Sequence, residues 1–187
     1  MSRGLGDVYK RQEECMYTFE EWKKNLIIVR GGGDIATGTI YKLYQSRFPV
    51  LVLEIANPSC IRRTISFCEA VFDKKVEVEG VTAKRAESLE DAFAIYGQGQ
   101  IPVMIDENGS MIQEVQPPVV VDAILAKRNL GTKITDAPAV IGVGPGFCAG
   151  KDVDAVIETQ RGHNLGRVIY EGEACLLYTS PSPRDMR

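Results

Sequence analysis

The segment from Leu26 to Gly38 constrains the fold of this chain more than any other. Its sequence, LIIVRGGGDIATG, joins an apolar run rich in β-branched residues to three consecutive glycines. Apolar residues then recur at Ile40, Leu43 and Tyr44 with the period of a helix. The segment therefore predicts a β-strand, a tight turn and an α-helix in succession.

The glycines fit the pattern G-x-G-x-x-(G/A) of dinucleotide-binding turns. In that pattern Gly31 makes the turn, Gly33 lets the backbone approach a pyrophosphate, and Ala36 lets the helix pack on the strand. The helix N-terminus offers main-chain N–H groups to an anion. Asp34 argues the other way, because a carboxylate in the first turn suits the helix dipole but repels a phosphate. A purely structural turn is the alternative.

A second apolar run, Val50 to Leu53, ends on Glu54. This acid follows Gly31 by roughly the 20 residues at which a dinucleotide-binding unit places the carboxylate that binds a ribose hydroxyl. If a nucleotide binds, Glu54 favours an unphosphorylated ribose.

Both ends of the chain have the properties of translated adaptor DNA. One DNA string that encodes residues 2–12 has a reverse complement that, shifted by one base, encodes residues 175–184. Unrelated protein termini do not have this relation, so we assign 1–12 and 175–187 as non-native segments and exclude them from fold reasoning. We expect residues 13–174 to form one Rossmann-like α/β domain that is truncated at its C-terminus.

Strand and helix patterns alternate along that domain. A hairpin is expected around Gly80, and further strands at 101–106 and 117–122. Helices are expected from Cys60 or Ile61 to about Phe72 behind a Ser59 cap, from Ser88 onward with Asp91 as capping partner, and briefly over 123–129. This alternation predicts an α/β fold that is Rossmann-like, with a mostly parallel sheet and helices on both faces.

Arg62 and Arg63 oppose the dipole at the start of the expected helix, because helix N-termini prefer acids. Arginines in such a place suit a phosphate or carboxylate ligand. Solvated side chains, or salt bridges to Glu69, Asp73 or a neighbouring strand, explain them equally well.

A second glycine cluster, around Gly144 and Gly146, follows an apolar strand over 139–143. Successive N–H groups in such a loop can form an anion-binding nest. The alternative is a tight crossing at which glycine permits close packing.

Composition excludes several classes of protein. The net charge of −3 does not suggest nucleic-acid binding, and no apolar run approaches transmembrane length. We therefore expect a cytoplasmic protein without nucleic-acid or membrane partners. The cysteines form no C-x-x-C pair, and the only histidine, His163, has no companion ligand nearby, so no metal site is indicated.

Four motifs in order resemble the YqeB family, whose members are named for a selenium-dependent molybdenum hydroxylase system. They are VRGGGDIATG at 29–38, IRRTISF at 61–67, VVVDAILAK at 119–127, and the stretch from GPGF at 144 to RGHNLGR ending at 167. The first is also similar to the nucleotide-binding segment of XdhC-type maturation factors. The resemblance implies an accessory role in maturing a molybdenum hydroxylase, which would be the partner, and carries over no catalytic residue.

Both lines of reasoning predict a phosphate-bearing small molecule on an α/β domain. The expected ligand is a nucleotide, either a dinucleotide such as NAD or a molybdopterin nucleotide. An NAD-dependent oxidoreductase and a non-catalytic nucleotide-binding scaffold are the alternative functions. The candidate binding residues are Arg30, Gly31, Gly32, Gly33, Asp34, Ala36, Glu54, Arg62, Arg63, Gly144 and Gly146.

Overall fold

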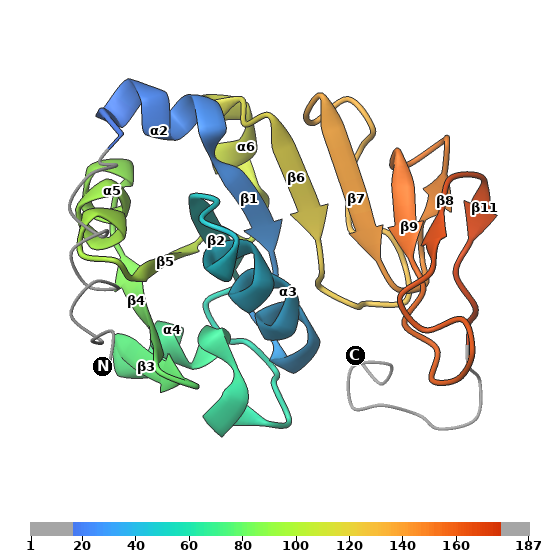
Figure 1. Cartoon of the computed structure of the whole chain (residues 1–187), viewed down its shortest axis with the longest axis horizontal. Coiled ribbons are helices and arrows are strands. Elements are labelled where there is room, and N and C mark those ends of the chain that lie inside the picture. Colours follow the sequence, from blue (N-terminus) through green and yellow to red (C-terminus); the bar gives the residue numbers. More distant parts are fainter. Residues whose placement is uncertain (1–16, 177–187) are drawn as a thin grey trace, which may run out of the picture.

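The computed structural model describes residues 17–176, which form an α/β fold around one nine-stranded sheet (Figure 1). Its strands are β1 (Ile27–Arg30), β2 (Val50–Glu54), β3 (Lys75–Val78), β4 (Val81–Ala86), β5 (Ile101–Ile105), β6 (Val119–Asp122), β7 (Ala139–Val143), β9 (Ala155–Ile157) and β10 (Val168–Ile169). A second sheet pairs β8 (Cys148–Ala149) with β11 (Gly172–Glu173). Apart from Cys175 and Leu176, the segments assigned to adaptor DNA lie outside the described residues.

The strand order, β10-β9-β7-β6-β1-β2-β5-β4-β3, confirms the Rossmann-like expectation. The chain proceeds from β1 to β2 and β5 on one side, then returns to place β6 and β7 on the other side of β1. Only the edge strands β3 and β10 pair antiparallel; the strands between them are parallel. The order therefore reverses between β1 and β6, the place where open parallel sheets bind their ligands.

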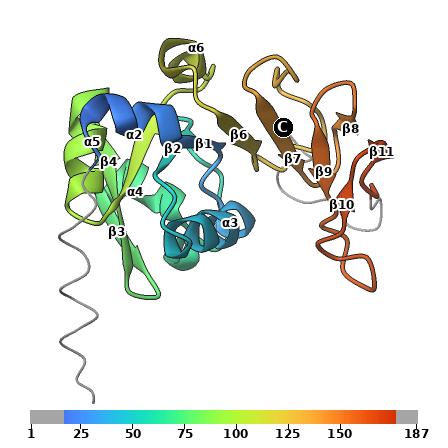
Figure 2. The ribbon, with the colours of Figure 1, turned by 45° about the horizontal axis from the view of Figure 1, so that its top comes forward.

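Helices cover both faces of the sheet, as expected, and each face has its own core (Figure 2). One core joins the sheet to α2 (Phe19–Asn25), α5 (Leu89–Gly97) and α6 (Ser110–Val115). The other joins it to α3 (Asp34–Gln45) and α4 (Ala70–Asp73). Strand β1 serves both cores because its side chains alternate: Ile28 faces the first, and Ile27 and Val29 face the second.

The elements nearest the glycines follow the predicted order. Helix α3 begins directly after Gly33, which is its N-cap residue, and buries Ala36 and Ile40 against the sheet. Trp22 of α2 is fully buried and packs against Phe93 of α5. Helix α2, just before β1, therefore covers the face of the sheet opposite to α3.

Local signals elsewhere were also predictive. The β3–β4 hairpin turns at Glu79 and Gly80, both with positive φ. The Ser88 side chain accepts a hydrogen bond from the N–H of Asp91 and caps α5. The chain turns at Asn108 and Gly109 after β5, and the short helix α6 that follows was not predicted from the sequence.

The helix expected from residue 60 to about 72 is wrong. That range instead holds two short 3₁₀ turns, η2 (Arg63–Ile65) and η3 (Phe67–Glu69), before the single turn of α4. Phe67 donates its N–H to the Thr37 hydroxyl, and Cys68 donates its N–H to the carbonyl of Gly32. Because these amides bind α3 and the glycine loop, they are not available to a continuous helix.

The short helix expected over 123–129 is also wrong. Ala123 extends the ladder by donating to the carbonyl of Arg30, and Ile124 donates to the Asp122 carboxylate. Leu125 and Lys127 then have φ of 59° and 56°, a left-handed conformation that interrupts a right-handed helix. Residues 123–130 therefore form an irregular loop directly after β6.

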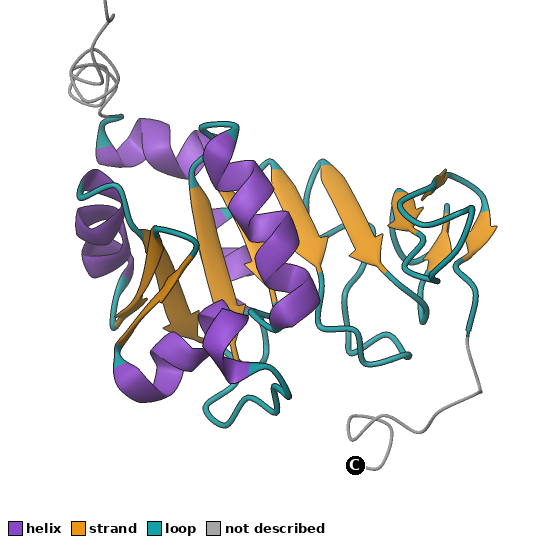
Figure 3. Ribbon diagram, turned by 60° about the horizontal axis from the view of Figure 1, so that its bottom comes forward, coloured by secondary structure: helices purple, strands orange, loops and turns teal. Residues whose placement is uncertain are grey.

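The sheet is not covered evenly. Within residues 17–176, the helices gather over the β1–β5 part, and loops with the small β8–β11 sheet lie beside β7 and β9 (Figure 3). Among the described helices, none has the length and apolar character needed to cross a membrane.

Candidate nucleotide-binding cavity

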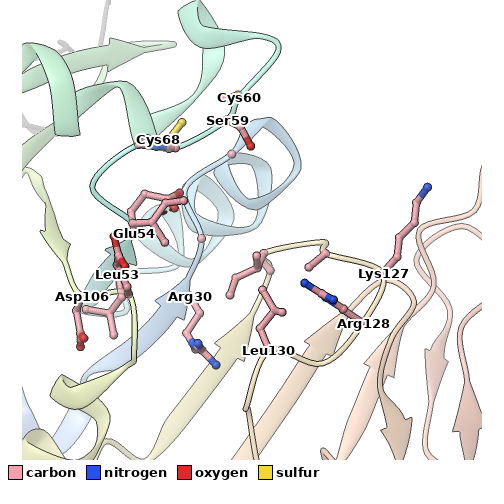
Figure 4. Close-up of a pocket in the computed structure, with 18 residues that line it drawn as sticks. Arg30, Leu53, Glu54, Ser59, Cys60, Cys68, Asp106, Lys127, Arg128 and Leu130 are labelled. Carbon is pink, nitrogen blue, oxygen red and sulfur yellow. Dashed lines mark hydrogen bonds between the residues drawn. The ribbon is translucent and has the colours of Figure 1, made fainter. Parts of the chain in front are cut away.

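A cavity of about 460 Å³ opens at the carboxyl ends of β1, β2, β5 and β6 (Figure 4). Its walls are the glycine loop, the segments that follow β2 and β5, Cys68, and the loop of residues 123–130. The cavity thus lies at the reversal point of the strand order. Ligand pockets in proteins typically enclose about 300–1,000 Å³, so this volume suits a small molecule.

The glycine loop forms one wall, and each of its residues has a different role. Gly31 has a φ of 92°, and a Cβ on it would lie 3.0 Å from the carbonyl oxygen of Ala123. Gly32 packs against the backbone of Cys68 at the same close range, so it makes no room for a ligand there. Gly33 lines the cavity at the N-terminus of α3, the position expected for a phosphate.

Glu54 lies at the end of β2 and lines the same cavity. Its carboxylate accepts hydrogen bonds from the N–H of Gly32 at 2.8 Å and from that of Ile55 at 2.9 Å. The acid is therefore fixed against the glycine loop. Carboxylate oxygens accept hydrogen bonds, and a sugar hydroxyl is one donor that a carboxylate can bind.

Arg30 is 6% exposed and lies where β1 and β6 end side by side. Its guanidinium contacts the Asp122 carboxylate at 3.4 Å and donates to the Thr132 hydroxyl, which in turn donates to Asp122. Burial raises the pKa of Asp122, while the Thr132 hydrogen bond and the Arg30 charge oppose that rise. Arg30 therefore places a guanidinium on the cavity wall, and Asp122 and Thr132 hold it in position.

Asp34 does not block the cavity. Its carboxylate lies 3.9 Å from the guanidinium of Arg62, and neither residue is part of the cavity wall. This ion pair offsets the negative charge that argued against a phosphate at the N-terminus of α3.

Arg63 lies outside the cavity wall as well. It binds Glu69 through two guanidinium nitrogens and lies over the ring of Phe72 at 5.0 Å. The Glu69 hydrogen bond and charge raise the pKa of Arg63. At this residue the structure favours the salt-bridge alternative over direct ligand binding.

Gly144 and Gly146 contact the back of the cavity wall and do not line it. A Cβ on Gly144 would lie 2.6 Å from the Leu125 side chain, and one on Gly146 would lie 2.5 Å from the N atom of Arg128. Both have positive φ. The structure thus favours close packing over an anion nest, because these glycines let the loop of residues 123–130 pack directly against the chain at 144–146.

One curated protein similar to this chain is from Escherichia coli (strain K12) and is named "Uncharacterized protein YqeB". The two sequences are 53% identical over 147 residues, which is 79% of this chain. The chain is a relative of YqeB. It spans 27% of the YqeB length, so the match concerns one part of that protein. No protein-family model matches the chain, and no solved structure matches it.

Sequence reasoning missed several residues of the cavity in this relative of YqeB. Asp106 lines the cavity directly after β5, whereas Asp122, at the end of β6, is not part of the cavity wall and binds Arg30. Both residues end or follow buried strands, as Glu54 does, and that shared position was a signal that the sequence offered. Arg128 carried no such signal, because its place depends on the irregular loop. In Figure 4 the Arg128 side chain extends on the side of Arg30, whereas Lys127 extends in another direction.

Proposed function

We propose that this cavity binds a nucleotide or a molybdopterin nucleotide, and that the protein is an accessory factor for a selenium-dependent molybdenum hydroxylase. One observation carries the first part. The cavity at the reversal point of the sheet is bounded by a glycine loop at a helix N-terminus, by the carboxylate of Glu54 and by Arg30. The second part rests on the resemblance of the four sequence motifs.

The proposed arrangement places phosphate at Gly33, where the first-turn N–H groups of α3 have no partner within the helix. Helix N-termini attract anions through these donors and through the helix dipole. The Glu54 carboxylate would accept a hydrogen bond from a ribose hydroxyl, as an acid does at the end of the second strand of a dinucleotide-binding unit. Arg30 and the exposed Arg128 would balance the remaining negative charge.

An NAD-dependent oxidoreductase is the second candidate, and Glu54 favours it specifically. An acid at this place selects an unphosphorylated ribose, which NAD has and NADP lacks at the adenosine 2′ position. A non-catalytic binding scaffold, whose nucleotide site is vestigial, is the third.

Thermal unfolding of the full chain with NAD, ATP, CTP and molybdopterin cytosine dinucleotide separates these candidates. A ligand at 100 times its Kd stabilises a protein by about 2.7 kcal/mol. For a chain of this size that corresponds to a rise in Tm of roughly 5–10 °C. The maturation factor should respond most to the molybdopterin nucleotide, and an oxidoreductase to NAD. An unchanged Tm with all four ligands would contradict nucleotide binding and favour the scaffold.

The partner is tested separately. If the protein serves a molybdenum hydroxylase, the tagged full chain should retain the purified hydroxylase of the same genome on an affinity resin. A Gly33→Asp variant that still retains the hydroxylase while losing the nucleotide response would separate docking from ligand binding. Failure of the wild-type chain to retain the hydroxylase would contradict the accessory role.

A further inference from the structure

The ionisable residues in the cavity wall are separated by charge. The carboxylates all end or follow β2 or β5, and they are Glu54, Asp106 and Glu107. The cations all end β1 or follow β6, and they are Arg30, Lys127 and Arg128. Because the strand order here is β6-β1-β2-β5, the acids lie on the β2 side of the glycine loop and the cations on the β6 side.

Arg30 retains hydrogen-bond donors beside the cavity. Its contacts with Asp122 and Thr132 both use Nη1. Within residues 17–176, its Nε and Nη2 atoms have no hydrogen-bond partner, and neither atom is fully enclosed. Asp122 is 1% exposed, and its two oxygens accept from the N–H of Ile124 and the Thr132 hydroxyl. Asp122 therefore balances the charge of Arg30 from behind the wall, and the remaining N–H groups of the guanidinium are available to a ligand.

Arg128 supplies a second guanidinium on the same side. Its residue is exposed, and among the described residues it has no ion-pair partner. Figure 4 shows its side chain extending toward the side on which Arg30 lies. Ile124 and Leu130 line the cavity from the same loop. The β6 side of the cavity thus offers cationic donors next to apolar surface.

We propose that this β6 side binds a carboxylate or phosphate on the second half of a dinucleotide. The proposal rests on the proposed function, in which Glu54 takes one ribose and Gly33 the pyrophosphate. The rest of such a ligand extends toward β6, where Arg30 and Arg128 lie. Guanidinium groups bind planar oxyanions through paired N–H groups. The preferred ligand is therefore a dinucleotide whose second half is anionic, because a neutral one leaves these donors without an anion.

NAD and nicotinic acid adenine dinucleotide test this preference, because they differ only in a carboxamide and a carboxylate on the second ring. Titration calorimetry of the full chain measures both affinities. A charged hydrogen-bonded pair contributes enough that the carboxylate form should bind about tenfold more tightly. The preference should shrink as salt is added, since the added interaction is between charges.

Arg128→Gln is the informative variant. Arg30→Gln would leave the buried Asp122 without its ion pair and lower stability, whereas Arg128 is exposed. In Arg128→Gln the ratio of the two affinities should fall below about threefold. Arg47→Gln is the matched control, because Arg47 is exposed and follows the far end of α3 from Gly33. This control should keep the wild-type ratio.

Equal affinities of the wild-type chain for the two dinucleotides would overturn the proposal. A ratio that survives in Arg128→Gln, or a failure of both dinucleotides to bind, would also overturn it. The proposed function fails separately, when none of the four ligands in the thermal unfolding experiment raises the Tm. A response to molybdopterin cytosine dinucleotide alone would leave nucleotide binding in place and remove the preference for an anionic second half.

Discussion

At the scale of single residues, the glycine loop shows what the sequence could and could not predict. The strained turn at Gly31 and the small residue at Ala36 follow from the motif, and the structure places both as expected. The contact of Gly32 with Cys68 does not follow, because it joins residues 36 positions apart through their backbones. Arg63 shows the same limit, since only the folded chain shows that Glu69 holds it.

Gly31→Ala should destabilise the protein by roughly 1–3 kcal/mol. Its φ of 92° is costly for alanine, and the added Cβ would meet the backbone of Ala123 and Ile124 at 3.0 Å. Urea unfolding measures the difference. Gly38→Ala is the matched control, because a Cβ there meets nothing within 4 Å and replaces a helical glycine. Gly38→Ala should raise the free energy of unfolding by roughly 0.5–1 kcal/mol. Equal effects of the two substitutions would contradict the explanation that the φ and the close contacts of Gly31 require glycine.

Asp106 gives a prediction about pH. Burial opposes ionisation, but hydrogen bonds from Met111, Ser110 and Gly109 together lower the pKa of Asp106. A lowered folded pKa adds stability that is present above the unfolded value, about 3.9, and is lost as the pH falls through the folded value. The free energy of unfolding of Asp106→Asn should therefore be about 1 kcal/mol lower than that of wild type at pH 7. This difference should shrink as the pH falls toward 3. A deficit that stays constant over this range would assign the effect to packing.

At the scale of elements, the sequence predicted strands better than it predicted the connections between them. Continuous apolar runs such as 119–121 identify strands buried on both faces regardless of their partners. The connections at 60–72 and 123–129 depend on tertiary contacts. In the second, the packing of Gly146 against residues 127 and 128 helps to fix a loop whose composition alone suggested a helix.

Ser88→Ala should destabilise the protein by roughly 0.5–2 kcal/mol, because α5 loses the hydrogen bond between the Ser88 hydroxyl and the N–H of Asp91. Chemical denaturation is again the measurement. Ser46→Ala, at an exposed position after α3, should have an effect within about 0.5 kcal/mol. A loss at Ser46 as large as that at Ser88 would show that capping is not the cause.

At the scale of the whole molecule, the strand order determines where chemistry can occur. The reversal between β1 and β6 brings Glu54, Arg30 and Asp122 to one edge of the sheet, although they come from three separate strands. The sequence predicted this class of fold and the first two of these residues. It could not predict the cavity itself, because the loop that closes it has no regular pattern.

The central claim is the proposed binding of a nucleotide at the glycine loop. Its most direct test is titration calorimetry with whichever of NAD, ATP, CTP and molybdopterin cytosine dinucleotide raises the Tm most, compared between wild type and Gly33→Asp. Gly33 has φ of −65° at the N-cap of α3, where aspartate is a favoured residue, so the variant should keep its fold while placing a negative charge at the proposed phosphate position. Gly38→Asp adds the same charge on the outer part of the same helix. We predict that Gly33→Asp loses at least tenfold in affinity, which corresponds to a loss of about 1.4 kcal/mol of binding free energy. Gly38→Asp should change the affinity by less than twofold. Equal affinities in all three proteins would contradict nucleotide binding at this loop.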